Sequence, residues 1–269
     1  MPAVLAVAVG CAAGDTGGGA ASTPSPSSPA ATPYPSPPGA PAPEGEGGPA
    51  YLALGDSLAA GVGAPLGEGY VDLVYAALGE RLPGLDLVGL GVSGETTGSM
   101  LAPGGQLERA EQALRTGGVR LVTIDIGAND GLGCALAQDE RCIDAALDEI
   151  RENLATVLTR LRAADPDVPV VAADYYLPVP PQLQSDPAEV AAALRVLGRL
   201  NGALAEVYAS FGVPVAPVSA AFGGDDPVSV VERTCALTPM CSGTPDIHPN
   251  AAGHAVIAQA LLATAPDVA

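Results

Sequence analysis

Short apolar runs alternate with longer segments of helical periodicity from residue 50 to the end of the chain. A short apolar run bounded by Gly, Pro or Asp predicts a buried strand, whereas apolar residues spaced three and four apart predict a helix that packs along one face. On this basis we expect five strands, at residues 51–54, 85–90, 119–126, 168–173 and 213–218.

The segments between these strands carry the helical pattern. Apolar spacing predicts helices at residues 69–82 and 142–164, and Ser185 and Asp186 before Pro187 mark the start of another that runs to Phe211. A last helix is expected at residues 251–263. Strands that alternate with helices predict a parallel sheet, so we expect one three-layer α/β/α domain at residues 50–269, with its site at the carboxyl ends of the strands.

A different composition precedes this domain. Of the 38 residues from 12 to 49, 34 are Gly, Pro, Ser, Thr or Ala, and none is Val, Leu or Ile. Such a segment cannot bury a core, so we expect a disordered linker there. Residues 1–11 resemble the end of a bacterial lipoprotein signal, which implies that Cys11 becomes lipidated. A short apolar N-terminus with a buried thiol at Cys11 is the alternative.

Composition and charge narrow the classes of partner. The net charge of −19 argues against binding to nucleic acid, and the acidic residues are spread as on a solvated surface. No apolar run approaches the roughly 18 residues of a membrane-spanning helix, so contact with a membrane is expected only through the lipid on Cys11. We expect a monomer that acts on a small-molecule, carbohydrate or lipid substrate.

Metal and cofactor chemistry is not expected. Two His and five Cys without ligand-like spacing do not predict a metal site, and no Gly-rich nucleotide-binding fingerprint is present. Four of the cysteines form two close pairs, Cys134 with Cys142 and Cys235 with Cys241. These pairs suit two disulfides in loops of an exported protein, and four reduced core thiols are the alternative.

Candidate catalytic groups follow three of the predicted strands. Ser57 lies in Gly55-Asp56-Ser57-Leu58, where a turn after the first strand projects the hydroxyl and a following helix N-terminus would favour an oxyanion. An ordinary N-cap serine is the alternative. Residues 91–97 follow the second strand and present the Gly94 amide, and residues 125–131 follow the third and carry the Asn129 side-chain amide. Such donors are what an oxyanion hole requires.

A candidate base lies just before the last predicted helix, in Pro245-Asp246-Ile247-His248-Pro249-Asn250. A nucleophilic serine needs a base with a pKa near neutrality, which an imidazole supplies. His248 is one of two histidines, and His254, inside the last helix, is more typical of packing.

These four segments, in this order, resemble the four sequence blocks of the GDSL or SGNH hydrolases, and most closely those of secreted actinobacterial-type members. The resemblance implies a flavodoxin-like α/β/α fold with a five-stranded parallel sheet and a serine ester hydrolase that acts through an acyl-enzyme on Ser57. It also implies His248 as the base, and an oxyanion hole made by the amides of Ser57 and Gly94 with the Asn129 side chain. Short-chain or acetyl esters, no cofactor and an extracellular, lipid-anchored location are the resulting expectations.

The chain departs from the family pattern beside His248. Pro245 stands where the family usually places its acid, and Asp246 lies two residues before His248. In an extended segment residues two apart point to the same side, so Asp246 is expected to orient the imidazole. A backbone carbonyl near Thr244 or Pro245 is the alternative.

Two questions stay open at the level of sequence. Tyr175 and Tyr176, beyond the fourth strand, are expected either to line the substrate pocket or to pack in the core. A surface-tethered carbohydrate- or cell-wall-binding module that retains the fold without turnover is the alternative function, because a fold does not by itself prove an activity.

Overall fold

The computed structural model describes residues 48–268, and residues Gly45–Ala269 belong to one compact unit. The predicted signal segment with Cys11, and residues 12–47 of the predicted linker, lie outside the described residues.

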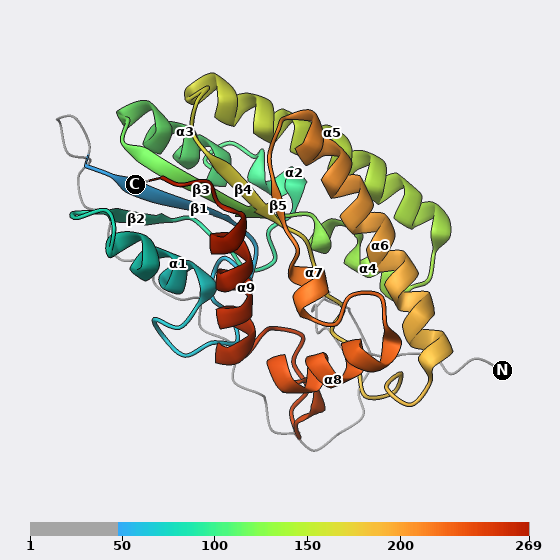
Figure 1. The fold of residues 1–269 in the computed structure, drawn as a ribbon. Coiled ribbons are helices and arrows are strands. Elements are labelled where there is room, and N and C mark those ends of the chain that lie inside the picture. Colours follow the sequence, from blue (N-terminus) through green and yellow to red (C-terminus); the bar gives the residue numbers. More distant parts are fainter. Residues whose placement is uncertain (1–47, 269) are drawn as a thin grey trace, which may run out of the picture. The chain divides into compact units, whose positions relative to one another are not determined.

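Five parallel strands form a single sheet at the centre of the described region (Figure 1). Their order across the sheet is β2-β1-β3-β4-β5, which is the flavodoxin-like order, and this confirms the predicted fold class. The strand order reverses between β1 and β3, and ligands of such sheets bind at this point. The strands are β1 Ala50–Gly55, β2 Asp86–Gly89, β3 Val119–Asp125, β4 Val170–Ala173 and β5 Val215–Ala216.

Helices cover both faces of this sheet (Figure 1). One face carries α1 and α9, and the other carries α3, α5 and α6. The long helices are α1 Tyr70–Gly79, α3 Gln106–Thr116, α5 Glu140–Ala164, α6 Pro187–Ser210, α8 Pro227–Leu237 and α9 Ala251–Thr264. The shorter ones are α2 Thr97–Met100, α4 Ala128–Leu136, α7 Val218–Ala221 and the 3₁₀ helix η1 Pro239–Cys241.

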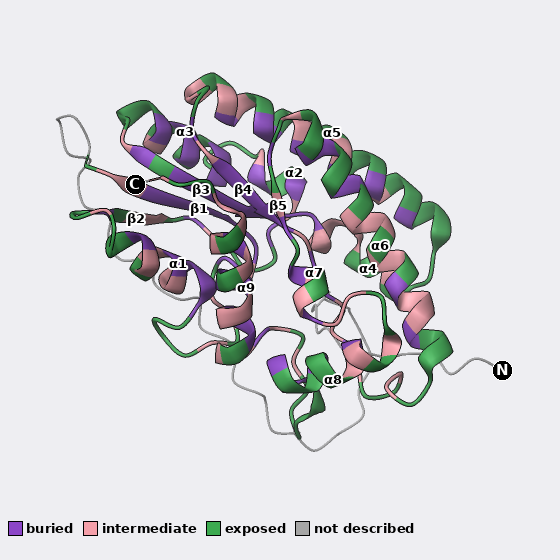
Figure 2. Cartoon of the chain, in the orientation of Figure 1, coloured by how far each residue is buried: buried purple, intermediate pink, exposed green. Residues whose placement is uncertain are grey.

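The core lies between the sheet and these two helical layers, where Figure 2 shows most of β1, β3 and β4 buried, whereas the edge strand β2 has no buried residue. Tyr51 to Leu54 in β1 are fully buried, as are Val171 and Ala172 in β4. Strands that are buried on both faces read as continuous apolar runs, which is why the sequence pattern located them.

Two predicted strands are shorter than expected because prolines limit them. β5 contains only Val215 and Ala216, since Pro214 and Pro217 lack the N–H that a ladder needs. β4 begins after Pro169 for the same reason, although the Pro169 carbonyl still accepts a hydrogen bond from the Val122 amide. The helices at residues 142–164, 187–211 and 251–263 are confirmed to within two residues at each end.

Both predicted cysteine pairs are joined as disulfides, with Cα–Cα distances of 5.4 Å for Cys134–Cys142 and 5.0 Å for Cys235–Cys241. The expectation that they lie in loops is wrong. The first joins α4 to α5 and the second joins α8 to η1, because each pair spans the short link between two consecutive helices.

Candidate active site

The end of β1 places Ser57 at the point where the strand order reverses. Gly55, the last residue of β1, has a φ of +145°, and a Cβ there would lie 2.7 Å from the Asp125 carboxyl group. Only glycine fits this close approach of β1 to β3. A series of turns follows Ser57, and α1 begins only at Tyr70, so the expected helix N-terminus directly after Ser57 is absent from this loop.

Asp56 holds the turn that carries Ser57. Its Oδ1 accepts a hydrogen bond from the Leu58 amide at 2.9 Å, and its Oδ2 accepts one from the Tyr175 hydroxyl at 2.7 Å. Ser57 therefore lies between two residues whose positions are fixed by a buried carboxyl group.

A second buried carboxyl group, Asp125, lies directly beneath this turn. Tyr70 donates a hydroxyl hydrogen bond to Asp125 Oδ1, and the Asp56 amide donates to Asp125 Oδ2 at 3.3 Å. Burial raises the pKa of Asp125 well above its usual value, and the neighbouring Asp56 carboxylate raises this pKa further. Burial also raises the pKa of Asp56, although the Leu58 and Tyr175 donors and the nearby His248 oppose the rise. Burial therefore favours the protonated form of both carboxyl groups, and of Asp125 the more strongly.

The loop after β2 and the start of α4 bring the predicted oxyanion donors together. Asn129, the second residue of α4, donates from its Nδ2 to the Glu95 carbonyl at 2.8 Å, directly beside Gly94. This bond uses one of the two Nδ2 protons. Within residues 48–268, neither the Ser57 amide nor the Gly94 amide donates a hydrogen bond to another group of the chain. Both amides can therefore donate to a substrate oxygen.

Sequence reasoning missed a clamp formed by Glu95 and Gln106. Gln106, the first residue of α3, donates from Nε2 to the Gly55 carbonyl and to Glu95 Oε2, each at 2.7 Å, and accepts from the Gly55 amide at 3.0 Å. The clamp ties the end of β1 to the loop that carries Gly94. No motif marks it, because a polar residue that begins a helix normally reads as exposed.

His248 contacts the carboxylate of Asp246. The His248 Nδ1 lies 2.7 Å from Asp246 Oδ1, and the His248 backbone amide donates to the same oxygen at 3.0 Å. Of the two carbonyls named as alternative partners, those of Thr244 and Pro245, the Thr244 carbonyl accepts from the Ser242 hydroxyl at 3.0 Å. No described group bonds to His248 Nε2, so this nitrogen can accept a proton.

The loop that follows Ser57 packs against the segment that carries His248. The Val62 amide donates to the Ser57 carbonyl at 3.0 Å. At the next residue, Gly63, a Cβ would lie 2.9 Å from the His248 Cβ and 2.3 Å from the Pro249 carbonyl oxygen. The loop after Ser57 and the segment that carries His248 are therefore in close contact, although they are distant in the sequence.

His254 braces the same loop from α9. Its Nδ1 accepts from the Tyr70 amide at 3.1 Å, and its Nε2 lies 3.0 Å from the Val62 carbonyl. Burial lowers the pKa of His254, so the ring is neutral and carries its proton on Nε2. The expected packing role for His254 thus includes two hydrogen bonds that position the Ser57 loop.

A family model covers this whole arrangement. Residues 53–256 match the GDSL-like lipase/acylhydrolase family, which is more than half of the chain. The chain belongs to this family. A segment of 81 residues is 40% identical to an arylesterase of Vibrio mimicus, and it spans 30% of this chain and 38% of that arylesterase.

Several solved structures share the fold of this chain. A lipase from a goat rumen metagenome matches with a TM-score of 0.58 and 22% identity, over 80% of this chain and 97% of that chain. A phospholipase A1 from Streptomyces albidoflavus matches with a TM-score of 0.57 and 23% identity, over 81% of this chain and 100% of that chain. An acetylxylan esterase from Geobacillus stearothermophilus matches with a TM-score of 0.54 and 22% identity, over 81% and 96%. Because these structures are only 22–23% identical to this chain in sequence, the comparison shows a shared fold alone.

Tyr175 and Tyr176 are both buried in this GDSL-like domain. Tyr175 donates to Asp56, and Tyr176 donates to the Ile247 carbonyl at 2.6 Å and stacks on Phe222 with ring centroids 4.0 Å apart. These contacts are those of core aromatic residues that position the loops of Ser57 and His248. A role for either ring in a substrate pocket stays a prediction.

Within residues 48–268, no three His, Cys, Asp or Glu side chains are grouped in a way that could hold a metal ion. None of the described helices combines the length and the apolar character that a bilayer span requires.

Proposed function

We propose that the protein hydrolyses carboxylic esters through a covalent acyl-enzyme on Ser57. The observation that carries this proposal is the 2.7 Å contact between His248 Nδ1 and Asp246 Oδ1. This contact favours the tautomer in which Nδ1 bears the proton and Nε2 is free to act as a base. The imidazole lies beside the loop that carries Ser57.

In the first step, Ser57 Oγ attacks the ester carbonyl carbon while His248 Nε2 takes the hydroxyl proton. The tetrahedral intermediate collapses as the imidazolium returns that proton to the leaving alcohol, and the acyl group stays on Ser57. A water molecule then attacks the acyl-enzyme with His248 again as the base, which releases the acid and restores the serine. Asp246 orients the imidazole and stabilises its cation in both steps.

The oxyanion of each tetrahedral intermediate would be stabilised by the amides of Ser57 and Gly94 and by the second Nδ2 proton of Asn129. Donors that are already in place cost no reorganisation when the charge develops, and removal of one typically lowers turnover by about 10²- to 10³-fold. Glu95 and Gln106 hold these donors in place. The Glu95 carbonyl accepts a hydrogen bond from Asn129, and Gln106 donates to the Glu95 side chain and so fixes the loop that carries Gly94.

The two disulfides support export from the cytoplasm, because such bonds persist in oxidising compartments. We further propose that the domain is held at the cell surface by a lipid on Cys11. Acetyl and other short-chain esters are the simplest substrates for this machinery, and the catalytic residues themselves do not select the acyl length.

The test is the release of nitrophenol from p-nitrophenyl butyrate by Ser57→Ala and His248→Ala. Both variants should lose activity by at least about 10³-fold, because the residual rate comes from the oxyanion donors and binding alone. Ser185→Ala, at an exposed serine before α6, is the matched control and should retain full activity. Wild-type activity in Ser57→Ala would contradict the mechanism.

Covalent labelling separates the enzyme from a binding module without turnover. A fluorophosphonate should modify Ser57 in the folded wild-type protein, and peptide mass spectrometry should find the adduct on that residue. A folded protein that is neither labelled nor active on acyl esters would favour the carbohydrate-binding alternative.

A further inference from the structure

Helix α4, whose second residue is the oxyanion candidate Asn129, presents two opposite faces. Its inner face packs on α5: a Cβ at Gly131 would lie 3.9 Å from the Ala146 Cβ, and Cys134 is joined to Cys142. Residues on a helix advance by about 100° each, so Leu132 and Leu136 lie within roughly 60° of Asn129 and away from that inner face. The face that carries Asn129 therefore continues as two leucines.

These two leucines are exposed. Leu132 is 42% exposed and Leu136 is 44% exposed, whereas most leucines of the domain are buried. Gly133 lies between them, and a Cβ placed on it would meet no atom within 4 Å. The long side chains of a helix lean toward its N-terminus, so both leucines incline toward Asn129. An apolar strip thus leads away from the oxyanion donor.

Three further exposed apolar side chains lie on the loops that carry the other candidate catalytic groups. Leu66, Val92 and Ile247 lie on the loops that carry Ser57, Gly94 and His248, respectively. Val228, on α8, is the only one of the six large exposed hydrophobic residues among residues 48–268 that lies on a segment without a candidate catalytic group. Exposed apolar groups concentrated around a polar site mark a surface that binds apolar ligands.

We propose that Leu132 and Leu136 bind the acyl chain of the substrate, so that the enzyme prefers esters of medium-length fatty acids to acetyl esters. This rests on the proposed function, because the ester carbonyl must sit at Asn129. At 1.5 Å of rise per residue the strip from Asn129 to Leu136 is about 10 Å long, which suits an acyl chain of several methylene groups and exceeds an acetyl group. An acyl chain is the occupant because the strip begins at the donor that would hold the carbonyl oxygen.

The experiment compares kcat/KM for p-nitrophenyl octanoate and p-nitrophenyl acetate, which differ only in the acyl chain. Burial of one methylene group changes affinity roughly fourfold, so Leu132→Ser and Leu136→Ser should each lower the octanoate-to-acetate ratio about three- to tenfold, and the double variant more. Leu136→Met should keep the wild-type octanoate-to-acetate ratio, because methionine is an apolar side chain of similar volume. Val228→Ser, at the exposed residue on α8, is the matched control and should leave both values unchanged.

Three results would overturn the proposal. An unchanged ratio in the double variant would show that the leucines do not contact the acyl chain, and an equal loss on both esters would show a general effect on the site. A loss of binding to phosphatidylcholine vesicles without a change in the ratio would assign the leucines to a lipid surface. Failure of the proposed function is distinguishable, since Ser57→Ala would then retain turnover of both esters.

Discussion

Asp246 reaches His248 through a turn that the sequence spacing does not reveal. A single oxygen, Oδ1, both accepts from the His248 amide and contacts the His248 ring. An aspartate that bonds the amide two residues ahead forms a local Asx turn, and this turn brings the carboxylate to the imidazole. The expected pairing is therefore present, but by a turn instead of the extended segment on which the expectation was based.

At the residue scale, we expect Asp246→Asn to lower kcat for p-nitrophenyl butyrate with little change in KM. An amide cannot stabilise the imidazolium and favours the wrong tautomer, a change that costs about 10⁴-fold in a serine protease with a buried aspartate. The Asp246 side chain is 45% exposed, so water compensates in part and a loss of at least about tenfold is expected.

Asp225→Asn, at an exposed aspartate before α8, is the control for this measurement and should leave kcat unchanged. If Asp246→Asn matched the wild type, a backbone carbonyl would have to orient His248 during the reaction.

At the element scale, the ends of β1 and β3 meet at the paired carboxyl groups of Asp56 and Asp125. Tyr70 from α1 donates to Asp125, and Tyr175 from the segment after β4 donates to Asp56. Tyr51 on β1 and Tyr208 on α6 also face the pair, and His248 lies close enough to Asp56 to favour its charged form. The turn of Ser57 is thus built on a buried pair of carboxyl groups.

This pair predicts how stability depends on pH. The pKa of Asp125 is raised in the folded protein by burial, so the folded state binds a proton that the unfolded chain releases. The contribution of Asp125 to the free energy of unfolding should therefore be complete below its unfolded pKa and should be lost as the pH rises toward the raised pKa, by up to about 1.4 kcal/mol per pH unit. An asparagine side chain cannot bind this proton, so Asp125→Asn should reduce the pH dependence of the free energy of unfolding, as measured by urea unfolding between about pH 5 and 9.

Asp148→Asn, an exposed aspartate on α5, is a matched control that should keep the wild-type slope, because its ion pair with Arg151 is exposed. A pH profile for Asp125→Asn as steep as that of the wild type would show that another group binds the proton.

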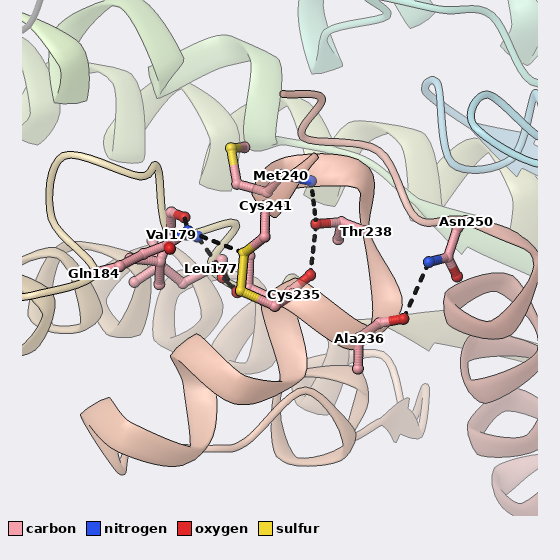
Figure 3. The surroundings of a disulfide bond; sticks show 10 residues. Leu177, Val179, Gln184, Cys235, Ala236, Thr238, Met240, Cys241 and Asn250 are labelled. Atoms are coloured by element: carbon pink, nitrogen blue, oxygen red, sulfur yellow. Dashed lines mark hydrogen bonds between the residues drawn. A yellow bond between two sulfur atoms is a disulfide. The ribbon is translucent and has the colours of Figure 1, made fainter. Parts of the chain in front are cut away.

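The second disulfide closes the end of α8 beside the contact between Ala236 and Asn250, and Asn250 lies two residues after His248 in the chain (Figure 3). Asn250, the N-cap of α9, donates from Nδ2 to the Ala236 carbonyl at 3.1 Å and from its amide to the Leu237 carbonyl at 2.8 Å. The Cys235–Cys241 bond closes the end of α8 directly at this contact, and Gln184 donates to its Cys241 sulfur at 3.2 Å.

Replacement of both Cys235 and Cys241 by serine should therefore lower the free energy of unfolding and kcat together. Loss of a link across six residues costs roughly 2 kcal/mol on the chain-entropy model. Urea unfolding measures the stability, and nitrophenol release measures kcat. The double variant Cys134→Ser/Cys142→Ser is the matched comparison and should lower the free energy of unfolding by a similar amount. Because this disulfide holds α4, which carries Leu132 and Leu136, its loss should change the rate on p-nitrophenyl octanoate more than the rate on p-nitrophenyl acetate.

At the scale of the whole molecule, the family match begins at residue 53 and the compact unit begins at Gly45. A chain that starts at residue 45 should therefore retain kcat/KM on p-nitrophenyl butyrate and the urea midpoint of the full chain. Full-length Cys11→Ser should also keep this activity, and in a bacterial host it should move from the membrane fraction to the soluble one. A large loss of activity on truncation would show that residues 1–44 contribute to the folded domain.

Much of the fold could be predicted because burial imposes local patterns. The strands β1 and β3 read as apolar runs, α5 and α6 read as amphipathic helices, and α6 also carries a clear start signal at Pro187. The helix α4 was not predicted, because its residues 128–136 include two glycines and bury no side chain fully. Local propensity is weak there, and contact with α5 across the Cys134–Cys142 bond accompanies the helix.

The order of the four motifs along the chain was sufficient to name Ser57, Gly94, Asn129, Asp246 and His248 as the candidate groups, since each lies in a short local segment. Their support was decided only by tertiary structure. The bond from Gln106 to Gly55, the pair of Asp56 and Asp125 and the bond from His254 to Val62 join residues 51 to 192 positions apart. Side chains that act across such distances carry no local periodicity. Their roles arise from the close approach of β1, β3 and α9, where burial makes each unpaired polar group costly and so selects partners from distant elements.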